Sequence, residues 1–388
     1  MPNFEDTQIA FAYKSNAELR KSYYIFQFFQ FNSLVNAGGR LAQWALKWHL
    51  PVGLFAKPTI YGQFVGGETL RETERTVNKL GKAGVNSILD YGIEGKNSES
   101  DFDKTLKHKL EALKYVKNNP YVKLISVKVS GLGRFALLEK VHRGSVLLQS
   151  EQREYERLRQ RLHQLCAAAK VANTGIFFDA EETWIQAPLD SLIEEMMAHY
   201  NQEQAIVYNT FQLYATSRLP YLMESYEKAQ LGGYILGAKL VRGAYMEKER
   251  ARAVAMGYPT PIHADKAAVD KDYKAALDFC LERFGKLAFS VASHNEDSCR
   301  YVAEQMTARG LPADNPLMFF SQLYGMGDHI TFNLAKEGFA TTKLIPYGPV
   351  KEVIPYLVRR AQENSSVEGQ TSRELGILTK EMKRRKLL

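Results

Sequence analysis

The sequence predicts an α/β protein whose main domain is a closed (β/α)8 barrel of the TIM type. Two observations lead to this fold class: eight short apolar and β-branched runs, and amphipathic helical stretches between them. An open doubly wound sheet is disfavoured because no glycine-rich G-x-G-x-x-G turn follows an early strand. The 388 residues suffice for one barrel with a helical arm, and a hydrophobic content of 45% supports a sizeable core.

Residues 1–60 are predicted to form an N-terminal helical arm, and residues 61–388 the barrel with its C-terminal segment. Within the arm, aromatic and apolar residues recur at helical spacing. We favour an arm packed on the main domain, because such stripes usually face a core. The alternative is a contact surface for a membrane or a partner helix. The stripe consists of Tyr24, Phe28, Phe31, Leu41, Trp44, Ala45 and Trp48.

After the arm, short strands alternate with helices. The helix predicted over residues 151–171 is typical, because Leu158, Leu162, Leu165 and Ala169 share one face and charged residues occupy the other. Such a helix covers a sheet on one side and faces water on the other. The eight strands are predicted over residues 87–91, 124–129, 176–179, 205–209, 235–241, 287–292, 317–320 and 344–347.

Polar side chains stand at the carboxyl end of most predicted strands, which is where a (β/α)8 barrel carries its ligand site. One polar strand end is unremarkable, whereas polar groups at the same end of most strands predict a site. In strand order from the second, these residues are Lys128 and Ser130; Asp179, Glu181 and Glu182; Gln212; Arg242 and Tyr245; Ser293, His294 and Asn295; Gln322, Tyr324 and Asp328; and Tyr347.

The segment 347–364 carries the strongest single signal. Tyr356, Arg359, Arg360 and Glu363 stand at helical spacing and share one face. Two adjacent guanidinium groups beside an apolar flank suit a carboxylate, because arginine holds carboxylate oxygens bidentately. Glu363 can pair with either arginine or accept a hydrogen bond from a ligand hydroxyl. The alternative is a surface helix with Arg–Glu ion pairs.

The segment 238–249 carries a second signal, because a buried strand leads directly into two basic residues, a glycine and a tyrosine. Gly243 allows a ligand to approach the backbone closely. Lys239 and Arg242 suit a phosphate or an electron-rich ring. The alternative is an ordinary strand end with a turn.

Two further groups have weaker signals. Asp179, Glu181 and Glu182 are clustered carboxylates, but no other residues with metal-ligand spacing accompany them, so no metal is predicted. Asp179 is better suited as a counter-charge to the arginine pair or to Lys128. His294 has the chemistry of a general base, yet we favour a contact with a cofactor.

Composition excludes several classes of protein. Part of the net charge of +8 lies in a basic C-terminal tail that we expect to be solvated, and no nucleic-acid-binding motif is present. Three cysteines favour neither disulfides nor zinc. No apolar run is long enough to span a membrane, and the first residues resemble neither a secretory signal nor a transit peptide. We therefore expect a soluble cytoplasmic protein.

Seven segments together resemble the proline dehydrogenase family, and they occur in the order found in that family. The resemblance covers most of the chain after the arm. It implies a distorted (β/α)8 barrel that binds FAD noncovalently at the strand ends. The seven segments are Ser-Val-Lys-Val-Ser-Gly (126–131), Phe-Asp-Ala-Glu-Glu (178–182), Tyr-Asn-Thr-Phe-Gln-Leu-Tyr (208–214), Lys-Leu-Val-Arg-Gly-Ala-Tyr (239–245), Ala-Ser-His-Asn (292–295), Leu-Tyr-Gly-Met-Gly-Asp (323–328) and residues 347–364.

The resemblance also assigns residues to the substrate. It implies that Arg359, Arg360 and Lys128 bind the proline carboxylate and that Asp179 lies beside this ionic network. Tyr347 would resist a 4-hydroxyl group, because the hydroxyproline-preferring branch of the family has a smaller residue there. The residues expected to wall the ring are Tyr245, Leu323, Tyr347 and Tyr356, with Ala244 close by.

For the cofactor, the resemblance implies that Lys239 donates a hydrogen bond near flavin N5, where negative charge grows during hydride transfer. Many bacterial members have arginine at this position, and the bifunctional members have tryptophan where this chain has Met246. The expected FAD contacts are Gln212, Lys239, Val241, Arg242, Gly243, Lys266, Ser293, His294 and Glu363.

The implied reaction is oxidation of L-proline to Δ1-pyrroline-5-carboxylate, with hydride passing from C5 to flavin N5 and electrons passing on to a quinone. A quinone acceptor implies peripheral contact with the inner face of a membrane. A separate pyrroline-5-carboxylate dehydrogenase would take the product. The alternatives are a hydroxyproline dehydrogenase, a barrel aldolase that uses Lys128 or Lys239 as a Schiff base, and a non-catalytic basic binding protein.

Overall fold

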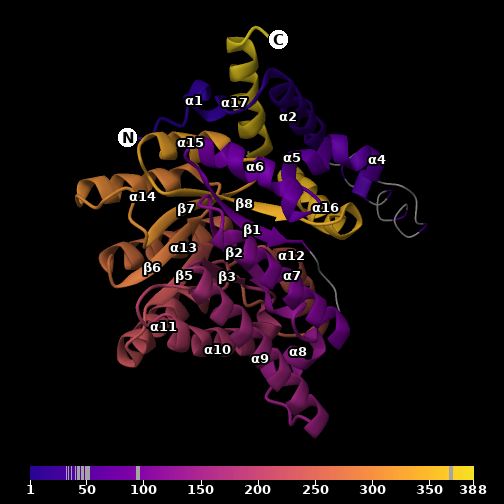
Figure 1. Ribbon diagram of the computed structural model, residues 1–388, viewed down its shortest axis with the longest axis vertical. Helices are drawn as coiled ribbons and strands as arrows, with labels where there is room; N and C mark the ends of the chain where they lie inside the picture. Colours follow the sequence, from indigo (N-terminus) through magenta and orange to yellow (C-terminus); the bar gives the residue numbers. More distant parts are fainter. Residues whose placement is uncertain are drawn as a thin grey trace. The chain divides into compact units, whose positions relative to one another are not determined.

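The computed structural model describes residues 1–31, 53–92, 97–366 and 370–388, together with residues 33, 35, 37–39, 41, 44 and 48 (Figure 1). Eight strands form a closed barrel in the order of the sequence. The predicted (β/α)8 fold class is therefore confirmed. The barrel strands are β1 (Asn86–Tyr91), β2 (Val122–Lys128), β3 (Gly175–Asp179), β4 (Val207–Gln212), β5 (Leu236–Val241), β6 (Leu287–Ala292), β7 (Met318–Leu323) and β8 (Thr341–Tyr347).

All eight strands form where apolar runs predicted them, with shifts at the ends. The largest shifts are at the carboxyl ends of β4 and β7, which extend further than predicted, and at the start of β8, which begins earlier than predicted. Gln212 and Gln322 were expected in loops, but they lie inside these strands and are buried. Polar residues extend a strand here because the barrel interior at its carboxyl end is itself polar.

The helices follow the strands as the alternating pattern predicted. Helix α9 buries Leu158, Leu162, Leu165 and Ala169, as the predicted apolar face required. The helices of the barrel are α6 (Leu70–Lys82), α7 (Glu99–Lys117), α8 (Phe135–His142), α9 (Gln149–Ala172), α10 (Thr183–Tyr200), α11 (Arg218–Gly232), α12 (Met246–Met256), α13 (Lys266–Glu282), α14 (Glu296–Ala308), α15 (Asp328–Lys336) and α16 (Val350–Ser366). The remaining helical elements are α1 (Thr7–Phe11), α2 (Asn16–Phe29), α4 (Gly53–Ala56), η1 (Lys57–Tyr61), α5 (Gly62–Phe64), η2 (Val129–Gly131) and α17 (Gln370–Arg384).

The chain divides into two compact units. The first unit contains Met1–Ile93 and Ser321–Leu388, and the second contains Glu94–Phe320. The predicted boundary between arm and barrel at residue 60 stays a prediction.

In the second unit, parallel pairing runs from β2 to β6. The register pairs Lys128 with Asp179 and Gln212 with Val241. These residues therefore end neighbouring strands at the same edge of the sheet, which is where parallel strands present functional side chains. The inner layer contains Phe177, whose ring stacks on that of Phe319 with centroids 5.8 Å apart.

In the first unit, β1 pairs with β8 in parallel, and the register sets Tyr91 beside Tyr347. The core of this unit joins helices from both ends of the sequence, and α1 and α2 lie beside α17 (Figure 1). Phe29 and Phe64 stack with ring centroids 6.0 Å apart. Leu357 of α16 packs in the same core. Each large apolar side chain buried here contributes about 1.5–3 kcal/mol to stability, so the core holds α16 firmly on its apolar face.

The predicted packing of the aromatic stripe in the arm is wrong. Tyr24, Phe28 and Phe31 are 61%, 46% and 56% exposed, whereas Phe26 and Phe29 are buried. The helix turns a different aromatic face to the core, because both faces of α2 are aromatic and spacing alone does not distinguish them. Farther along the stripe, Leu41, Trp44 and Trp48 are also exposed, and Ala45 lies outside the described residues. None of the described helices combines the length and apolarity needed to cross a membrane.

The predicted solvated C-terminal tail is confirmed only in part: most of its basic side chains are exposed, but most of the segment forms helix α17. Ile377, Leu378 and Met382 of α17 are buried in the core of the first unit. Arg385, just beyond the helix, donates hydrogen bonds to the backbone carbonyls of Phe11 and Lys14 at 2.7 and 2.9 Å. Apolar residues at helical spacing were present in this segment, but its many charges masked them. The remaining basic residues of the predicted tail are Lys380, Lys383, Arg384 and Lys386.

Candidate functional site

A largely buried ion pair lies at the carboxyl ends of β3 and β5 in the second unit. Lys239 Nζ donates to Asp179 Oδ1 at 2.7 Å, and Ser126 Oγ donates to Asp179 Oδ2 at 2.7 Å. Burial opposes ionisation of Asp179, but the Lys239 ammonium, the Ser126 hydroxyl and the charge of Lys128 outweigh it and hold its pKa below the usual range. Asp179 was expected to balance Lys128 or the arginine pair. It pairs with Lys239, and the charge of Lys128 also favours its ionised form.

The Lys239 ammonium also lies over an aromatic ring, with Nζ 5.0 Å from the centroid of Phe177. A carboxylate and a ring face thus fix one cation, and the Ser126 hydroxyl holds the carboxylate in place. Ser126 and Phe177 were not assigned contacts from the sequence. The alternation of inward-facing residues along β2 and β3 is the signal that could have found them.

The other two carboxylates after β3 have separate partners. The backbone N–H of Ser130 donates to Glu181 Oε1 at 2.9 Å, and the Ser130 hydroxyl donates to the other oxygen. Burial raises the pKa of Glu181 above its usual range, although Lys128 and Ser130 act in the opposite direction. Glu182 pairs with Lys248 at 2.9 Å. Glu181 and Glu182 therefore each bind a separate donor, Ser130 and Lys248.

Gln212 joins two strand-end loops. Its amide nitrogen donates to the carbonyl of Glu181 at 2.8 Å, and its amide oxygen accepts from the backbone N–H of Ala244 at 3.1 Å. The nitrogen and the oxygen of this buried side-chain amide therefore both form hydrogen bonds, and the bond to Ala244 fixes the backbone of the loop after β5. That loop contains Gly243, which the sequence singled out for close approach of a ligand.

Gly243 adopts a backbone conformation that favours glycine, with φ +142°. A Cβ at this position would lie 2.3 Å from the ring of Tyr214, so a side chain cannot be accommodated. The loop backbone therefore passes directly over an aromatic ring, with Arg242 on one side and Ala244 on the other.

Arg242 is the centre of a polar cluster. Its guanidinium donates to Asp270 Oδ1 at 2.7 Å, Ser293 Oγ at 2.9 Å and Ser298 Oγ at 3.0 Å. Lys266 contacts the same Asp270 carboxylate. Burial opposes ionisation of Asp270, but Lys266 and Arg242 outweigh it and hold its pKa below the usual range. Two cations and one carboxylate leave this cluster with net positive charge, which suits an anionic ligand such as the phosphates of a dinucleotide.

Strand β8 of the first unit ends in Tyr347, which is 3% exposed. Its ring lies 5.1 Å from that of Tyr91, at an angle of 41°. Tyr61 donates to the carbonyl of Gly348 at 2.8 Å, and Glu68 accepts from the backbone N–H of Val350 at 3.2 Å. The turn from β8 into α16 is therefore held by side chains at both ends, which fixes where α16 starts.

Helix α16 forms as predicted and presents two faces. Leu357 is buried in the core, whereas Tyr356, Arg359 and Arg360 lie on the partly exposed side. The Arg360 guanidinium lies over the Tyr356 ring, 5.4 Å from its centroid. A cation and an aromatic face are thus combined beside an apolar surface. Glu363 lies in α16, but its side chain is outside the described residues.

The structure distributes the predicted site residues over both units. It brings together Lys239 with Asp179, Arg242 with Ser293, and Arg360 with Tyr356. The second unit contains Lys128, Asp179, Gln212, Lys239, Val241, Arg242, Gly243, Tyr245, Lys266, Ser293 and His294. The first unit contains Leu323, Tyr347, Tyr356, Arg359 and Arg360.

Comparison with known proteins agrees with the sequence motifs. The model of the family described as proline dehydrogenase matches residues 73–373. The chain belongs to the proline dehydrogenase family. The predicted enzyme class, an oxidoreductase of this family, is therefore confirmed.

Three relatives illustrate the range of the family. The chain is 33% identical to the carbapenem antibiotics biosynthesis protein CarD of Pectobacterium carotovorum subsp. carotovorum, over 83% of each chain. It is 31% identical to proline dehydrogenase 1, mitochondrial, of Dictyostelium discoideum, over 98% of this chain and 74% of the relative. It is also 31% identical to the hydroxyproline dehydrogenase of Mus musculus, over 97% and 93%.

A solved structure shares the fold. Proline utilization A (PutA) from Bdellovibrio bacteriovorus, inactivated by N-propargylglycine, superposes with a TM-score of 0.71 at 21% identity. The match covers 80% of this chain and 33% of the PutA chain, so this chain spans about a third of that protein's length. At this identity the likeness extends to the fold alone.

Proposed function

We propose that this protein oxidises L-proline to Δ1-pyrroline-5-carboxylate, using noncovalently bound FAD. The observation that carries the proposal is the basic and aromatic face of α16, which begins directly after β8 and carries Tyr356, Arg359 and Arg360. Family membership supports it, because this face belongs to the motif that proline dehydrogenases share. The paired arginines suit a substrate with one carboxylate, since a guanidinium binds both of its oxygens.

Each group of residues has a proposed role toward the substrate. Arg359 and Arg360, together with Lys128, bind the carboxylate, as the family motif implies. Asp179 balances the positive charge of Lys239 and Lys128. The ring is enclosed by Tyr245, Leu323, Tyr347 and Tyr356.

The residues of the second unit fit an FAD cofactor. Arg242 and Lys266 supply positive charge for the pyrophosphate, and Gly243 lets the loop that carries Arg242 pass close to the Tyr214 ring. When bound, FAD supplies the electron acceptor for the hydride from proline C5 and passes the electrons on to a quinone. Lys239 would place an ammonium group where negative charge grows. The other proposed FAD contacts are Gln212, Val241, Ser293, His294 and Glu363.

The full chain, purified and supplied with FAD, tests the proposal directly. We expect a yellow protein whose oxidised-flavin absorbance is bleached by L-proline in the absence of oxygen. The product should react with an aldehyde reagent after ring opening. A protein that binds no flavin and does not respond to L-proline would contradict the proposal and favour the aldolase or the non-catalytic binding protein.

A second candidate, hydroxyproline dehydrogenase, is favoured by relatives with that name, such as the mouse protein. Tyr347 argues for proline, because its bulk is proposed to lie beside ring carbon C4. Replacing Tyr347 by serine should raise kcat/KM for trans-4-hydroxy-L-proline relative to L-proline by about tenfold or more, the range for one group in a substrate pocket. Steady-state kinetics with both substrates measure this ratio. Tyr347→Phe keeps the bulk and should keep the preference for proline; an equal change in both variants would contradict this role.

We further propose peripheral membrane contact through the exposed aromatic residues Tyr24, Phe28 and Phe31. A quinone acceptor is lipid-soluble, and aromatic side chains favour the membrane interface. Replacing all three by serine should lower the affinity for liposomes by about tenfold or more, because each buried aromatic contributes about 1.5–3 kcal/mol. Sedimentation with liposomes measures the affinity, and a soluble dye acceptor checks that turnover itself is intact.

The matched control replaces Leu231 and Val254 by serine, because these apolar residues are 91% and 85% exposed and lie on other helices. We expect this control variant to bind liposomes as the unmodified protein does. Deleting the whole arm is unsuitable, since Phe26 and Phe29 belong to the core. Unchanged liposome binding of the triple variant would exclude this surface.

A further inference from the structure

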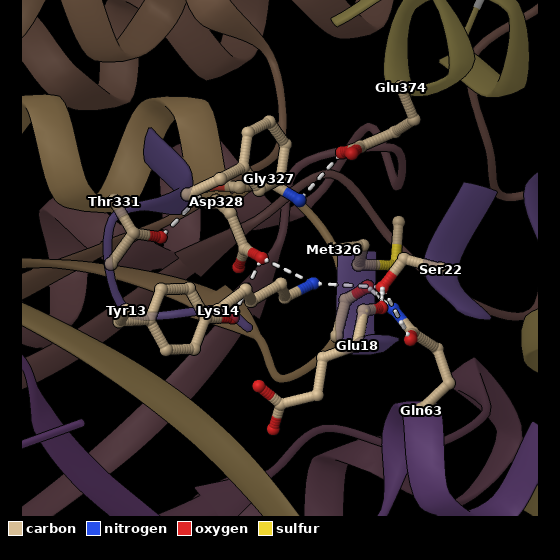
Figure 2. Close-up of polar contacts among 12 residues, drawn as sticks. Tyr13, Lys14, Glu18, Ser22, Gln63, Met326, Gly327, Asp328, Thr331 and Glu374 are labelled. Carbon is tan, nitrogen blue, oxygen red and sulfur yellow. Dashed lines mark hydrogen bonds and ion pairs between the residues drawn. The ribbon is translucent and has the colours of Figure 1, made fainter. Parts of the chain in front are cut away.

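A buried carboxylate in the first unit has three polar partners from distant parts of the chain. Asp328 lies at the start of α15, just after the loop that follows β7, and its side chain is 2% exposed. Its oxygens contact Lys14 Nζ at 3.0 Å, Lys343 Nζ at 2.9 Å and the hydroxyl of Tyr13 at 2.8 Å. Figure 2 shows Tyr13 and Lys14 directed at this carboxylate.

The charges in this cluster compensate one another. Burial opposes ionisation of Asp328, but Lys14, Lys343 and Tyr13 outweigh it and hold its pKa well below the usual range. Burial also lowers the pKa of Lys343, and Asp328 acts in the opposite direction. A buried ion pair of this kind adds little stability compared with apolar residues of the same volume. The positions of the groups that the ion pair holds are therefore more informative than its contribution to stability.

Lys343 connects this cluster to Leu323. Besides Asp328, its ammonium donates to the backbone carbonyl of Leu323 at 3.3 Å and to that of Met326. Lys343 lies on β8, the strand that ends in Tyr347, and the backbone N–H of Tyr324 donates to the carbonyl of Leu344 at 2.9 Å. Lys343 therefore fixes the carbonyl of Leu323, which is proposed to enclose the substrate ring. Lys343 lies on the same strand as Tyr347, a second residue proposed to enclose the ring.

Further side chains hold the rest of the same loop. Gln63 donates to the carbonyl of Gly325 at 2.6 Å, and Glu374 accepts from the backbone N–H of Gly327 at 2.6 Å (Figure 2). Lys14 also donates to Ser22 at 3.1 Å, and Ser22 donates to Gln63 at 2.9 Å. The loop after β7 is thus held by residues of the arm, of α5, of β8 and of α17, which are far apart in the sequence.

We infer that Asp328 and Lys343, with Tyr13 and Lys14 of the arm, form a positioning centre that fixes Leu323 and thereby sets the affinity for the substrate ring. This inference rests on the proposed function, because it requires Leu323 to contact the ring. The arm is then part of the machinery for substrate recognition. The arginines of α16 bind the carboxylate, and the positioning centre acts on the ring alone.

Lys343→Met tests this separation. Methionine keeps much of the side-chain length but cannot donate to the carbonyl of Leu323, so Leu323 loses its fixed position. We expect kcat/KM for L-proline to fall by about tenfold to a hundredfold, the loss that a small misplacement causes. The affinity for cyclopentanecarboxylate should fall by a similar factor, whereas that for acetate, which has no ring, should stay unchanged. Isothermal calorimetry on the FAD-loaded full chain measures both dissociation constants without turnover.

Tyr13→Phe is a milder second variant in case Lys343→Met does not fold. It removes one hydrogen bond to Asp328 and keeps the ring stacked on Phe332, with centroids 4.3 Å apart. We expect a smaller loss in the same direction, about twofold to fivefold for the ring-bearing ligand, as one hydrogen bond to a charged group is removed. The control is Val116→Ala, which removes buried apolar volume on α7 of the second unit and should lower stability without changing the ratio of the two affinities.

The outcomes separate the inference from the proposed function. If the unmodified protein is not bleached by L-proline, the proposed function fails. If it is bleached, but Lys343→Met and Tyr13→Phe weaken both carboxylates equally or leave both unchanged, the positioning role of this cluster is excluded. A loss that Val116→Ala reproduces would mean general destabilisation and would also overturn the inference. The inference is supported if Lys343→Met and Tyr13→Phe, but not the control, lose affinity for cyclopentanecarboxylate and keep their affinity for acetate.

Discussion

Replacing Arg359 by methionine is expected to raise the KM for L-proline at least about 30-fold, with FAD content near that of the unmodified protein. Removing one partner of a buried charge pair costs about 2–5 kcal/mol, and about 1.4 kcal/mol corresponds to a tenfold change in affinity. Methionine keeps the apolar part of the side chain, so the effect reports the lost guanidinium. Steady-state kinetics give the KM, and flavin absorbance gives the cofactor content.

Arg153→Met is the matched control. Arg153 is exposed on α9 and donates to Gln149 within the same helix, so its loss should leave KM unchanged. If Arg359→Met loses FAD and keeps an ordinary KM, then Arg359 belongs to the cofactor. If both KM and FAD content are unchanged, the face of α16 is the ion-paired surface that the sequence also allowed.

The sequence predicted the barrel well, because its strands are buried on both sides and therefore appear as continuous apolar runs. The errors at β4 and β7 have one cause. Gln212 and Gln322 are polar, so the runs seemed to end before them, yet both side chains are buried. Polar residues inside the functional end of a barrel look like loop residues when only the sequence is available.

Contacts between side chains that are far apart in the chain could not be predicted from the sequence. Lys239 and Asp179 are separated by 60 positions, and nothing in their spacing indicates a distance of 2.7 Å between their side chains. Both were recognised as site residues from the family motifs, but their pairing required the order of the strands and their registers. Lys14 and Lys343, at opposite ends of the chain, are a second example, because they meet on one carboxylate.

The faces of the terminal helices were unpredictable for another reason. In α2, Phe26 and Phe28 are both aromatic and only two positions apart, yet one is buried and the other exposed. Hydrophobic spacing shows that a helix has an apolar face, but the partner decides which face is covered. Here the partner includes α17, which the sequence had suggested to be a solvated tail.

Replacing Asp179 by asparagine is expected to destabilise the protein by about 3–5 kcal/mol, because it leaves the buried Lys239 ammonium without its counter-charge. The double variant Asp179→Asn/Lys239→Met should recover much of this loss, since both charges are then absent. Chemical unfolding at neutral pH of the unmodified protein, Asp179→Asn, Lys239→Met and the double variant measures the coupling free energy. The control is Glu154→Gln, which breaks the more exposed pair with Arg134 and should cost no more than about 1 kcal/mol.

The sign of the pH dependence follows from the lowered pKa of Asp179, which has the ion pair as its cause. A carboxyl whose pKa is lower in the folded than in the unfolded protein stabilises the fold fully above the unfolded pKa, about 4 for aspartate. That contribution is lost as the pH falls through the folded pKa. The difference in unfolding free energy between the unmodified protein and Asp179→Asn should therefore be constant near neutral pH and shrink in acid. A difference that instead grows below pH about 4 would mean that Asp179 is protonated in the folded protein, which its contacts with Lys239 and Ser126 oppose.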